Sequence, residues 1–199
     1  MVERGRLIEL IGTTGSGKTT FAKDLGPYLG ATVFLETTEG NPYIGNSHKS
    51  GEHSWDNQVW FLKQYVERLS KATRLVKDGK IAIIDSGLPT YILHSKLLIP
   101  NRSDQFNDLA ARLTQHLALP DLTLYLKDTT EFLMNRLKKR NKKYDDATPD
   151  FIDKLTELHD AWTTQTNLPV MTIRSRDLEH EGLKADIIRT ITLNLKTSL

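Results

Sequence analysis

Short apolar runs alternate along the chain with longer segments in which apolar residues recur at spacings of three and four. This alternation is typical of βαβ units, which build a parallel sheet buried between helices. Strands apolar enough to be covered on both faces are predicted at residues 7–11, 32–35, 81–84, 122–126 and 170–173. Helices are predicted at residues 18–29, 55–77, 104–117, 130–140, 149–164 and 183–194. The pattern therefore predicts an α/β protein with a five-stranded parallel sheet.

Less regular stretches lie between these elements, at residues 36–54, 97–103 and 141–148. They are polar and contain turn-forming residues, but none has the composition of a linker between domains. The sequence also contains no internal repeat and no low-complexity segment. We therefore expect residues 1–199 to form one domain, in which these stretches are loops that contact a ligand.

The composition is that of an ordinary soluble protein, with 38% hydrophobic and 26% charged residues. Lys and Arg number 27 against 25 Asp and Glu, and this net charge of +2 is too small to indicate a general binder of nucleic acid or membrane surfaces. The absence of cysteine excludes a disulfide framework and a cysteine nucleophile, and is typical of a reducing compartment. No signal peptide or membrane-spanning run is visible, so we expect a cytoplasmic location.

A glycine-rich loop follows the first predicted strand and opens the first predicted helix, which is the context in which this motif binds a nucleoside triphosphate. Gly15 and Gly17 allow the backbone N–H groups to turn toward phosphate oxygens. Lys18 is predicted to reach the β- and γ-phosphates, and the Thr19 hydroxyl to bind Mg²⁺. The residues predicted to hold ATP are Gly12, Thr13, Thr14, Gly15, Ser16, Gly17, Lys18, Thr19 and Thr20.

Candidate residues for the phosphoryl acceptor lie farther along the chain. Glu36 follows the second predicted strand, at the sheet edge where ligands bind, and is predicted to accept the proton of an attacking hydroxyl across a crevice from the glycine-rich loop. Asp85 ends the third predicted strand, a natural position for a carboxylate near Mg²⁺. On the long helix, Gln64 offers an amide that matches a nucleobase edge beside Trp60 and Phe61. Most rings of this helix are expected in the core, with one lining the base pocket.

A basic cluster from Arg136 to Lys143 stands out in a nearly neutral chain and is followed by Tyr144 and Asp145. A segment of this kind, at about residues 136–148, is predicted to form a lid that closes over the triphosphate. Arg136 and Arg140 are predicted to stabilise the charge on the transferred group. A solvated helix end is the alternative interpretation of this cluster.

These segments together resemble the deoxynucleoside kinase family, especially its bacterial deoxyadenosine and deoxyguanosine kinase branch. Glu36 with Asn41-Pro42 is similar to the family's base glutamate and the Asn-Pro turn that follows it. Phe61-Leu62-Lys63-Gln64 is similar to the helix segment whose glutamine pairs with the nucleobase. Similarity to the family's fourth strand, lid and following helix extends over Pro120-Asp121-Leu122, Arg136, Arg140, Lys142 and residues 151–162.

The resemblance implies a three-layer P-loop NTPase fold with a helical lid. It implies that the γ-phosphate of ATP, bound with Mg²⁺, is transferred to the 5′-hydroxyl of a deoxynucleoside in a homodimer, as a step of nucleotide salvage. It also places Tyr43 and Asp145 among the substrate contacts, and Arg176, in the loop after the last predicted strand, over the adenine.

One position departs from the family pattern. Members usually carry an acidic residue, then arginine, then serine at the end of the third strand, whereas here Asp85 is followed by Ser86-Gly87. That arginine normally helps to hold the base glutamate, so Arg102 or one of the two lid arginines is the candidate replacement. The acidic residue that contacts the base in many relatives is Tyr91 here, which leaves the choice of base open.

Two other functions remain open at this point. A nucleoside monophosphate kinase, such as thymidylate kinase, shares the P-loop and the lid, but its acceptor carries a phosphate and needs basic residues on the acceptor side. Residues 36–54 offer only Lys49, which favours an uncharged nucleoside. A nucleotide-binding regulator without catalytic activity is the second alternative, because of the missing arginine.

Overall fold

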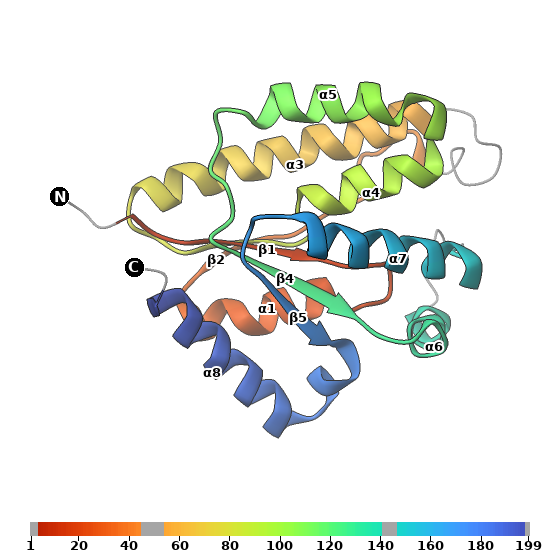
Figure 1. Cartoon of the computed structure of the whole chain (residues 1–199). Coiled ribbons are helices and arrows are strands. Elements are labelled where there is room, and N and C mark those ends of the chain that lie inside the picture. The colour runs from red at the N-terminus through yellow and green to blue at the C-terminus, as the bar shows by residue number, and fades with distance from the viewer. Residues whose placement is uncertain (1–3, 45–53, 141–146, 198–199) are drawn as a thin grey trace.

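The computed structural model describes residues 4–44, 54–140 and 147–197. Its sheet has five parallel strands in the order β2-β3-β1-β4-β5 (Figure 1). The strands are β1 (Leu7–Ile11), β2 (Thr32–Phe34), β3 (Ala82–Ile84), β4 (Leu122–Lys127) and β5 (Val170–Arg174), which confirms the predicted sheet. β1 pairs with β3 on one side and with β4 on the other, so the chain reverses its direction of winding at β1. Ligands of open α/β sheets bind at such a point, at the carboxyl ends of the strands.

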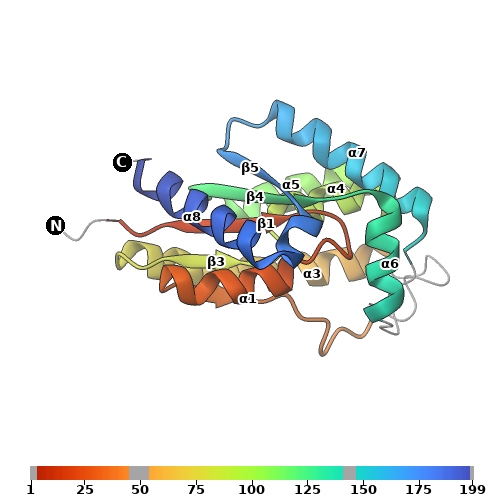
Figure 2. The same cartoon turned by 90° about the horizontal axis from the view of Figure 1, so that it is seen from below.

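Helices cover both faces of the sheet. They are α1 (Lys18–Leu29), α3 (Ser54–Lys77), α4 (Leu88–Leu98), α5 (Ser103–Thr114), α6 (Thr130–Arg140), α7 (Pro149–Gln165) and α8 (Glu181–Thr197), with 3₁₀ turns η1 (Pro100–Arg102) and η2 (Ser175–Glu179). α1 and α8 lie on one face and α3, α4 and α5 on the other, whereas α6 lies at the end toward which the strands run (Figures 1 and 2). In the described ranges, no helix is long and apolar enough to cross a bilayer.

The alternation of side chains along β1 sorts the core into two halves, because neighbouring residues of a strand point to opposite faces. Ile8 and Leu10 belong to the cluster that contains Phe21 of α1 and Ile191 of α8. Leu7 belongs to the opposite cluster, with residues of α3, α4 and α5. The third residue of the strand, Glu9, is equally buried and faces α3, where Tyr65 donates a hydrogen bond to it.

One helix was not predicted. The sequence pattern predicts no element at Leu88–Leu98, and the predicted loop at residues 97–103 includes the end of this helix. Its apolar residues are spread around the helix rather than along one stripe, and α4 contacts α3, α5 and α7. A helix surrounded by other elements needs no polar face and therefore lacks the periodicity that reveals amphipathic helices. The start signal that the sequence does carry is Pro89 in the first turn.

Candidate active site

The glycine-rich loop joins β1 to α1 at the carboxyl edge of the sheet. Gly12, Gly15 and Gly17 have φ angles of 139°, 82° and 92°, which L side chains rarely adopt. Space is also lacking, because a Cβ atom on Gly12 would lie 2.2 Å from the backbone oxygen of Leu126. A Cβ atom on Gly17 would lie 2.9 Å from Nη2 of Arg136. The conformation and the close approach together explain why the loop carries glycine at these positions.

Polar groups of the loop point inward. The Lys18 ammonium donates hydrogen bonds to the backbone oxygens of Gly12, at 2.9 Å, and Thr13, at 3.0 Å. Burial lowers the pKa of Lys18, and the nearby carboxylates of Asp85 and Glu36 oppose this shift. The buried hydroxyls of Thr13 and Ser16 have no hydrogen-bond partner among the described residues. A lysine and unpartnered donors gathered at a helix N-terminus suit an anionic ligand.

Thr19 and Asp85 form a second polar group beside the loop. The Thr19 hydroxyl donates to Oδ2 of Asp85 at 2.5 Å, whereas Oδ1 of Asp85 is buried without a partner among the described residues. Burial raises the pKa of Asp85, while Lys18 and the Thr19 hydrogen bond favour its ionised form. A hydroxyl and a carboxylate with a spare oxygen are donors that Mg²⁺ prefers, so these two residues fit that ion.

Four residues from three places, α3, the end of β3 and α4, gather near Glu36, and we call them with Glu36 the acceptor cluster: Glu36, Arg68, Asp85, Ser86 and Tyr91. Tyr91 of α4 donates its phenolic proton to Oε1 of Glu36 at 2.8 Å, and Ser86 donates to Oε2 at 3.0 Å. Arg68 of α3 donates from Nη2 to the Tyr91 oxygen at 2.6 Å and from Nη1 to the backbone oxygen of Asp85 at 2.8 Å. The cluster thus ties the ends of β2 and β3 to two helices.

The backbone around Ser86 is shaped for this contact. Ser86 has a φ of 65°, the only positive value at a non-glycine position in the described ranges. Such conformations are costly and concentrate at functional sites. The N–H of Asp85 donates to the oxygen of Phe34 at 3.0 Å, which holds the end of β3 beside the segment that leads to Glu36. Because Glu36 also acts on the pKa of Lys18, its carboxylate lies within electrostatic range of the glycine-rich loop.

The predicted base-binding residues are distributed over α3 and the segment before it. Trp60 and Phe61 are half-buried and pack edge to face, with ring centroids 5.1 Å apart. Gln64 is half-buried, and its backbone oxygen accepts a hydrogen bond from Nε of Arg68 at 3.3 Å. The backbone N–H of Tyr43 donates to the side chain of Asn41 at 2.9 Å.

Two amides at the start of α3 are more buried than Gln64 and were not predicted. Asn57 and Gln58 are 3% and 5% exposed, and Oδ1 of Asn57 accepts a hydrogen bond from the Asn41 amide at 2.8 Å. The signal in the sequence was weak, because amides are common on helix surfaces and only burial distinguishes these two.

The first half of the predicted lid is helix α6, which packs directly on the glycine-rich loop. A Cβ atom on Gly15 would lie 3.0 Å from the backbone oxygen of Leu133. Arg136 lies over Gly17, and Nη2 of Arg140 is 3.5 Å from the Thr14 hydroxyl. The structure therefore brings both predicted arginines beside the glycine-rich loop. The remaining lid candidates, Lys142, Lys143, Tyr144 and Asp145, lie outside the described residues.

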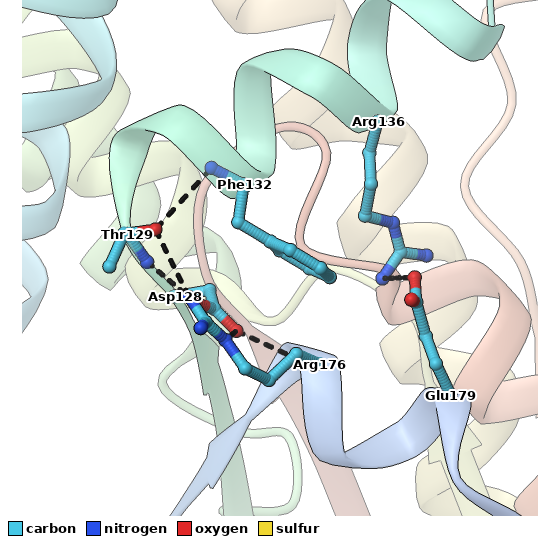
Figure 3. A network of polar contacts seen from close by, with 6 residues as sticks. All are labelled: Asp128, Thr129, Phe132, Arg136, Arg176 and Glu179. Carbon is cyan, nitrogen blue, oxygen red and sulfur yellow. Dashed lines mark hydrogen bonds and ion pairs between the residues drawn. The ribbon is translucent and has the colours of Figure 1, made fainter.

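Arg176 belongs to a polar network between η2 and the start of α6 (Figure 3). Its Nε donates to both oxygens of Asp128, at 2.9 and 3.1 Å, and its Nη2 also donates to Oδ1 of that residue. Burial would raise the pKa of Asp128, but the hydrogen bonds from Arg176 lower it. The Phe132 ring lies between Arg176 and Arg136, and Arg136 is 3.8 Å from Glu179 (Figure 3). The contact of Arg176 with adenine therefore stays a prediction.

A family of known proteins matches this chain over most of its length. The family model described as deoxynucleoside kinase matches residues 8–195 of the chain. The chain belongs to the deoxynucleoside kinase family. Membership confirms the predicted class of enzyme, an ATP-dependent kinase of nucleosides.

Relatives of the chain include kinases with different acceptors. A deoxyguanosine kinase of Bacillus subtilis is 26% identical over 141 residues, which cover 69% of this chain and 68% of the relative. A probable thymidylate kinase of Methanosarcina acetivorans is 29% identical over 169 residues, covering 78% and 80%. A solved structure of a deoxyadenosine kinase from M. mycoides with bound dATP has a TM-score of 0.78 at 20% identity and covers 94% of this chain and 99% of that one. This last likeness concerns the fold.

The three arginines predicted to replace the family arginine lie in different surroundings from a fourth arginine, Arg68. Arg102 lies in η1 with its guanidinium 3.7 Å from the centroid of Trp55, and its Nε donates to Gln105. Arg136 and Arg140 lie on the donor side, whereas Arg68 reaches the acceptor cluster. Arg68 was not predicted, although it is three residues beyond the buried Tyr65 and so lies on the sheet side of α3. A charge on the buried stripe of a helix is the signal that could have found it.

Proposed function

We propose that this deoxynucleoside kinase transfers the γ-phosphate of ATP to the 5′-hydroxyl of a deoxynucleoside, with Glu36 as the general base. The observation that supports this assignment is the orientation of Glu36, whose two oxygens accept hydrogen bonds from Tyr91 and Ser86. A carboxylate held in this way keeps further lone pairs for a substrate hydroxyl and can accept its proton as the oxygen attacks phosphorus. Its electrostatic effect on Lys18 links it to the donor side.

On the donor side, we assign the glycine-rich loop and Lys18 to the triphosphate. Thr19 and Asp85 would hold Mg²⁺, which supplies positive charge to the β- and γ-phosphate oxygens when bound. Arg136 lies over the same loop and Arg140 beside it, so their guanidinium groups are suited to stabilise charge on the transferred phosphoryl group. Phosphoryl transfer depends mainly on such positioning and charge neutralisation.

The acceptor assigned here is a deoxynucleoside because two of the curated relatives, from Bacillus subtilis, are a deoxyguanosine kinase and a deoxyadenosine/deoxycytidine kinase. Gln64, Trp60 and Phe61 stay candidates for the base, and Tyr43 and Asp145 for other substrate contacts. A homodimer, a cytoplasmic location and a role in nucleotide salvage are part of the same proposal.

A nucleoside monophosphate as acceptor is the second candidate, favoured by the similarity to a probable thymidylate kinase. Such an acceptor needs a cation for its own phosphate. Among the described residues, the basic side chain in the acceptor cluster is Arg68, and both of its terminal nitrogens already donate to protein oxygens. This arrangement favours the uncharged nucleoside.

Incubation of the purified protein with γ-labelled ATP, Mg²⁺ and a panel of nucleosides and nucleoside monophosphates tests the proposal. We expect labelled deoxynucleoside monophosphate. Labelled diphosphate from a monophosphate acceptor would establish the second candidate instead. Hydrolysis or no transfer across the whole panel would contradict both and favour a regulator.

A further inference from the structure

We propose that Arg68 is a positioning residue that holds the general base Glu36 through Tyr91, in place of the arginine that the family carries after the third strand. The proposal rests on the assignment of Glu36 as the base. It assigns a role to a residue of α3 that the sequence motifs do not include. The family's arginine at the end of β3 would thus be replaced by a contact between two helices, from Arg68 of α3 to Tyr91 of α4.

The directions of two hydrogen bonds determine how the Tyr91 hydroxyl is oriented. A guanidinium group only donates, so the Tyr91 oxygen must accept from Nη2 of Arg68, at 2.6 Å. The single phenolic proton is then free to point in one direction, toward Oε1 of Glu36, at 2.8 Å. Without Arg68, the Tyr91 hydroxyl can accept from or donate to other groups, and its orientation is no longer imposed. Arg68 therefore makes Tyr91 a hydrogen-bond donor to the Glu36 carboxylate.

Arg68 is itself held at three points. Nη1 donates to the Asp85 backbone oxygen at 2.8 Å and Nε to the Gln64 backbone oxygen at 3.3 Å, in addition to the bond to Tyr91. Burial works against its charge, but Tyr91 and Glu36 more than offset this and raise its pKa. The guanidinium thus stays protonated and cannot swing without breaking three contacts.

Packing fixes the position of the Tyr91 ring, so the orientation of its hydroxyl depends on its hydrogen bonds. Tyr91 is 4% exposed, and its ring centroid lies 5.4 Å from that of Tyr65. The Tyr65 hydroxyl in turn donates to the buried Glu9 at 2.6 Å. A hydroxyl on a ring held in this way can move only by rotation of its proton, which is the motion that Arg68 restricts.

Loss of Arg68 should lower kcat without changing the affinity for ATP. A misplaced base lowers the rate of the chemical step, and displacement by about 1 Å can reduce it ~10²-fold. The nucleotide side has its own cations, so its affinity should not depend on Arg68. We therefore expect Arg68→Ala to lower kcat by ~30- to 100-fold while the KM for ATP changes by less than about twofold. Arg74→Ala, which removes an exposed arginine of the same helix, is the matched control and should keep wild-type values.

Two further measurements separate positioning from a merely structural role. Added guanidinium ion should restore part of the kcat of Arg68→Ala and leave Arg74→Ala unchanged. In a Glu36→Gln background, Arg68→Ala should lower kcat by no more than about twofold, because there is no base left to position.

Tyr91→Phe, which removes only the hydroxyl, should reproduce the kcat loss and needs no removal of a buried charge. It provides the same test if Arg68→Ala does not fold.

The outcomes are distinguishable. Wild-type kcat in Arg68→Ala or Tyr91→Phe, or equal losses in the wild-type and Glu36→Gln backgrounds, would overturn the role of Arg68 and leave the proposed function standing. If Glu36→Gln alone keeps full turnover, or the wild-type protein phosphorylates no nucleoside, the proposed function itself is wrong. The expected result is a large kcat loss that depends on the presence of Glu36 and responds to guanidinium.

Discussion

The two sides of the site are built in different ways. The donor side is a continuous stretch, Gly12 to Thr20, whose backbone and side chains act together, with α6 packed against it. The acceptor cluster draws its five residues from four places: the segment after β2, the end of β3, α3 and α4. A continuous motif keeps its geometry from one strand-loop-helix unit, whereas the acceptor cluster exists only once those elements have packed. The first is therefore readable from a sequence pattern and the second is not.

Charge is also arranged differently on the two sides. On the donor side, the cations Lys18, Arg136 and Arg140 gather around the glycine-rich loop. On the acceptor side, the carboxylate of Glu36 meets two neutral hydroxyls, and the cation Arg68 lies behind one of them. This difference suits a charged phosphate donor and an uncharged acceptor, because cations around the loop can neutralise phosphate charge, whereas the two groups that contact the Glu36 carboxylate are neutral.

The largest effect should come from the donor side. Lys18→Ala removes the cation that the loop directs at the phosphates, so kcat/KM for ATP should fall ~10³-fold. Nucleoside binding, measured by calorimetric titration, should be retained because Lys18 is not part of the acceptor cluster. Lys23→Ala, an exposed lysine of the same helix, is the control. Equal loss of nucleoside binding in Lys18→Ala would mean that the two sides are not separate.

Glu36→Gln should have the opposite effect to Lys18→Ala, with turnover lost and nucleotide binding kept. Loss of the general base should reduce kcat ~10²-fold or more, while titration with an ATP analogue should give an unchanged Kd. Glu39→Gln, which alters an exposed glutamate of the same segment, should behave as the wild type. An unchanged kcat in Glu36→Gln would remove this residue from the chemistry.

A smaller effect concerns Glu9, which supports the acceptor side from the interior through Tyr65. Burial raises the pKa of Glu9 from 4.5 to about 6, although the Tyr65 hydrogen bond opposes the shift. The folded protein therefore binds this proton more tightly than the unfolded chain. Its stabilising effect is complete below pH 4.5 and is lost as the pH rises through 6, a change of about 2 kcal/mol.

Urea unfolding of the wild type and Glu9→Gln at several pH values measures this contribution. The free energy of unfolding of Glu9→Gln relative to the wild type should rise by about 2 kcal/mol between pH 4.5 and pH 7. A constant difference across this range would show that burial does not raise the pKa of Glu9.

The smallest expected effect separates two reasons why a position requires glycine: a positive φ angle, and a neighbouring group too close for a side chain. Gly17→Ala and Gly30→Ala both place a side chain at positive φ, 92° and 58°, and each should lose about 1 kcal/mol of stability in thermal unfolding. Only at Gly17 does the new Cβ atom meet Arg136, whereas nothing lies within 4 Å of it at Gly30. The KM for ATP should therefore rise in Gly17→Ala alone, and the same rise in Gly30→Ala would contradict the placement of Arg136.

The regular elements were largely predictable because their signals are local. The five strands and α1, α3, α6 and α7 begin and end within one residue of the predicted bounds. α5 is shorter, ending at Thr114 rather than residue 117, and α8 is longer at both ends. α4 was missed because a helix packed against α3, α5 and α7 needs no continuous polar face. Its omission also hid the place of Tyr91, since an unassigned segment gives no direction for a side chain.

The sequence by itself determined where the five strands and the helices other than α4 lie along the chain. It also determined the glycine-rich loop with Lys18 and Thr19, and the positions of Glu36 and Asp85 at the ends of their strands. These follow from interactions among residues that are close along the chain. Only the tertiary structure decided that Arg68, 32 residues after Glu36 and 23 before Tyr91, donates to the tyrosine that contacts the Glu36 carboxylate. Hydrogen bonds between such distant residues depend on how whole helices pack on the sheet, and no local pattern encodes that distance.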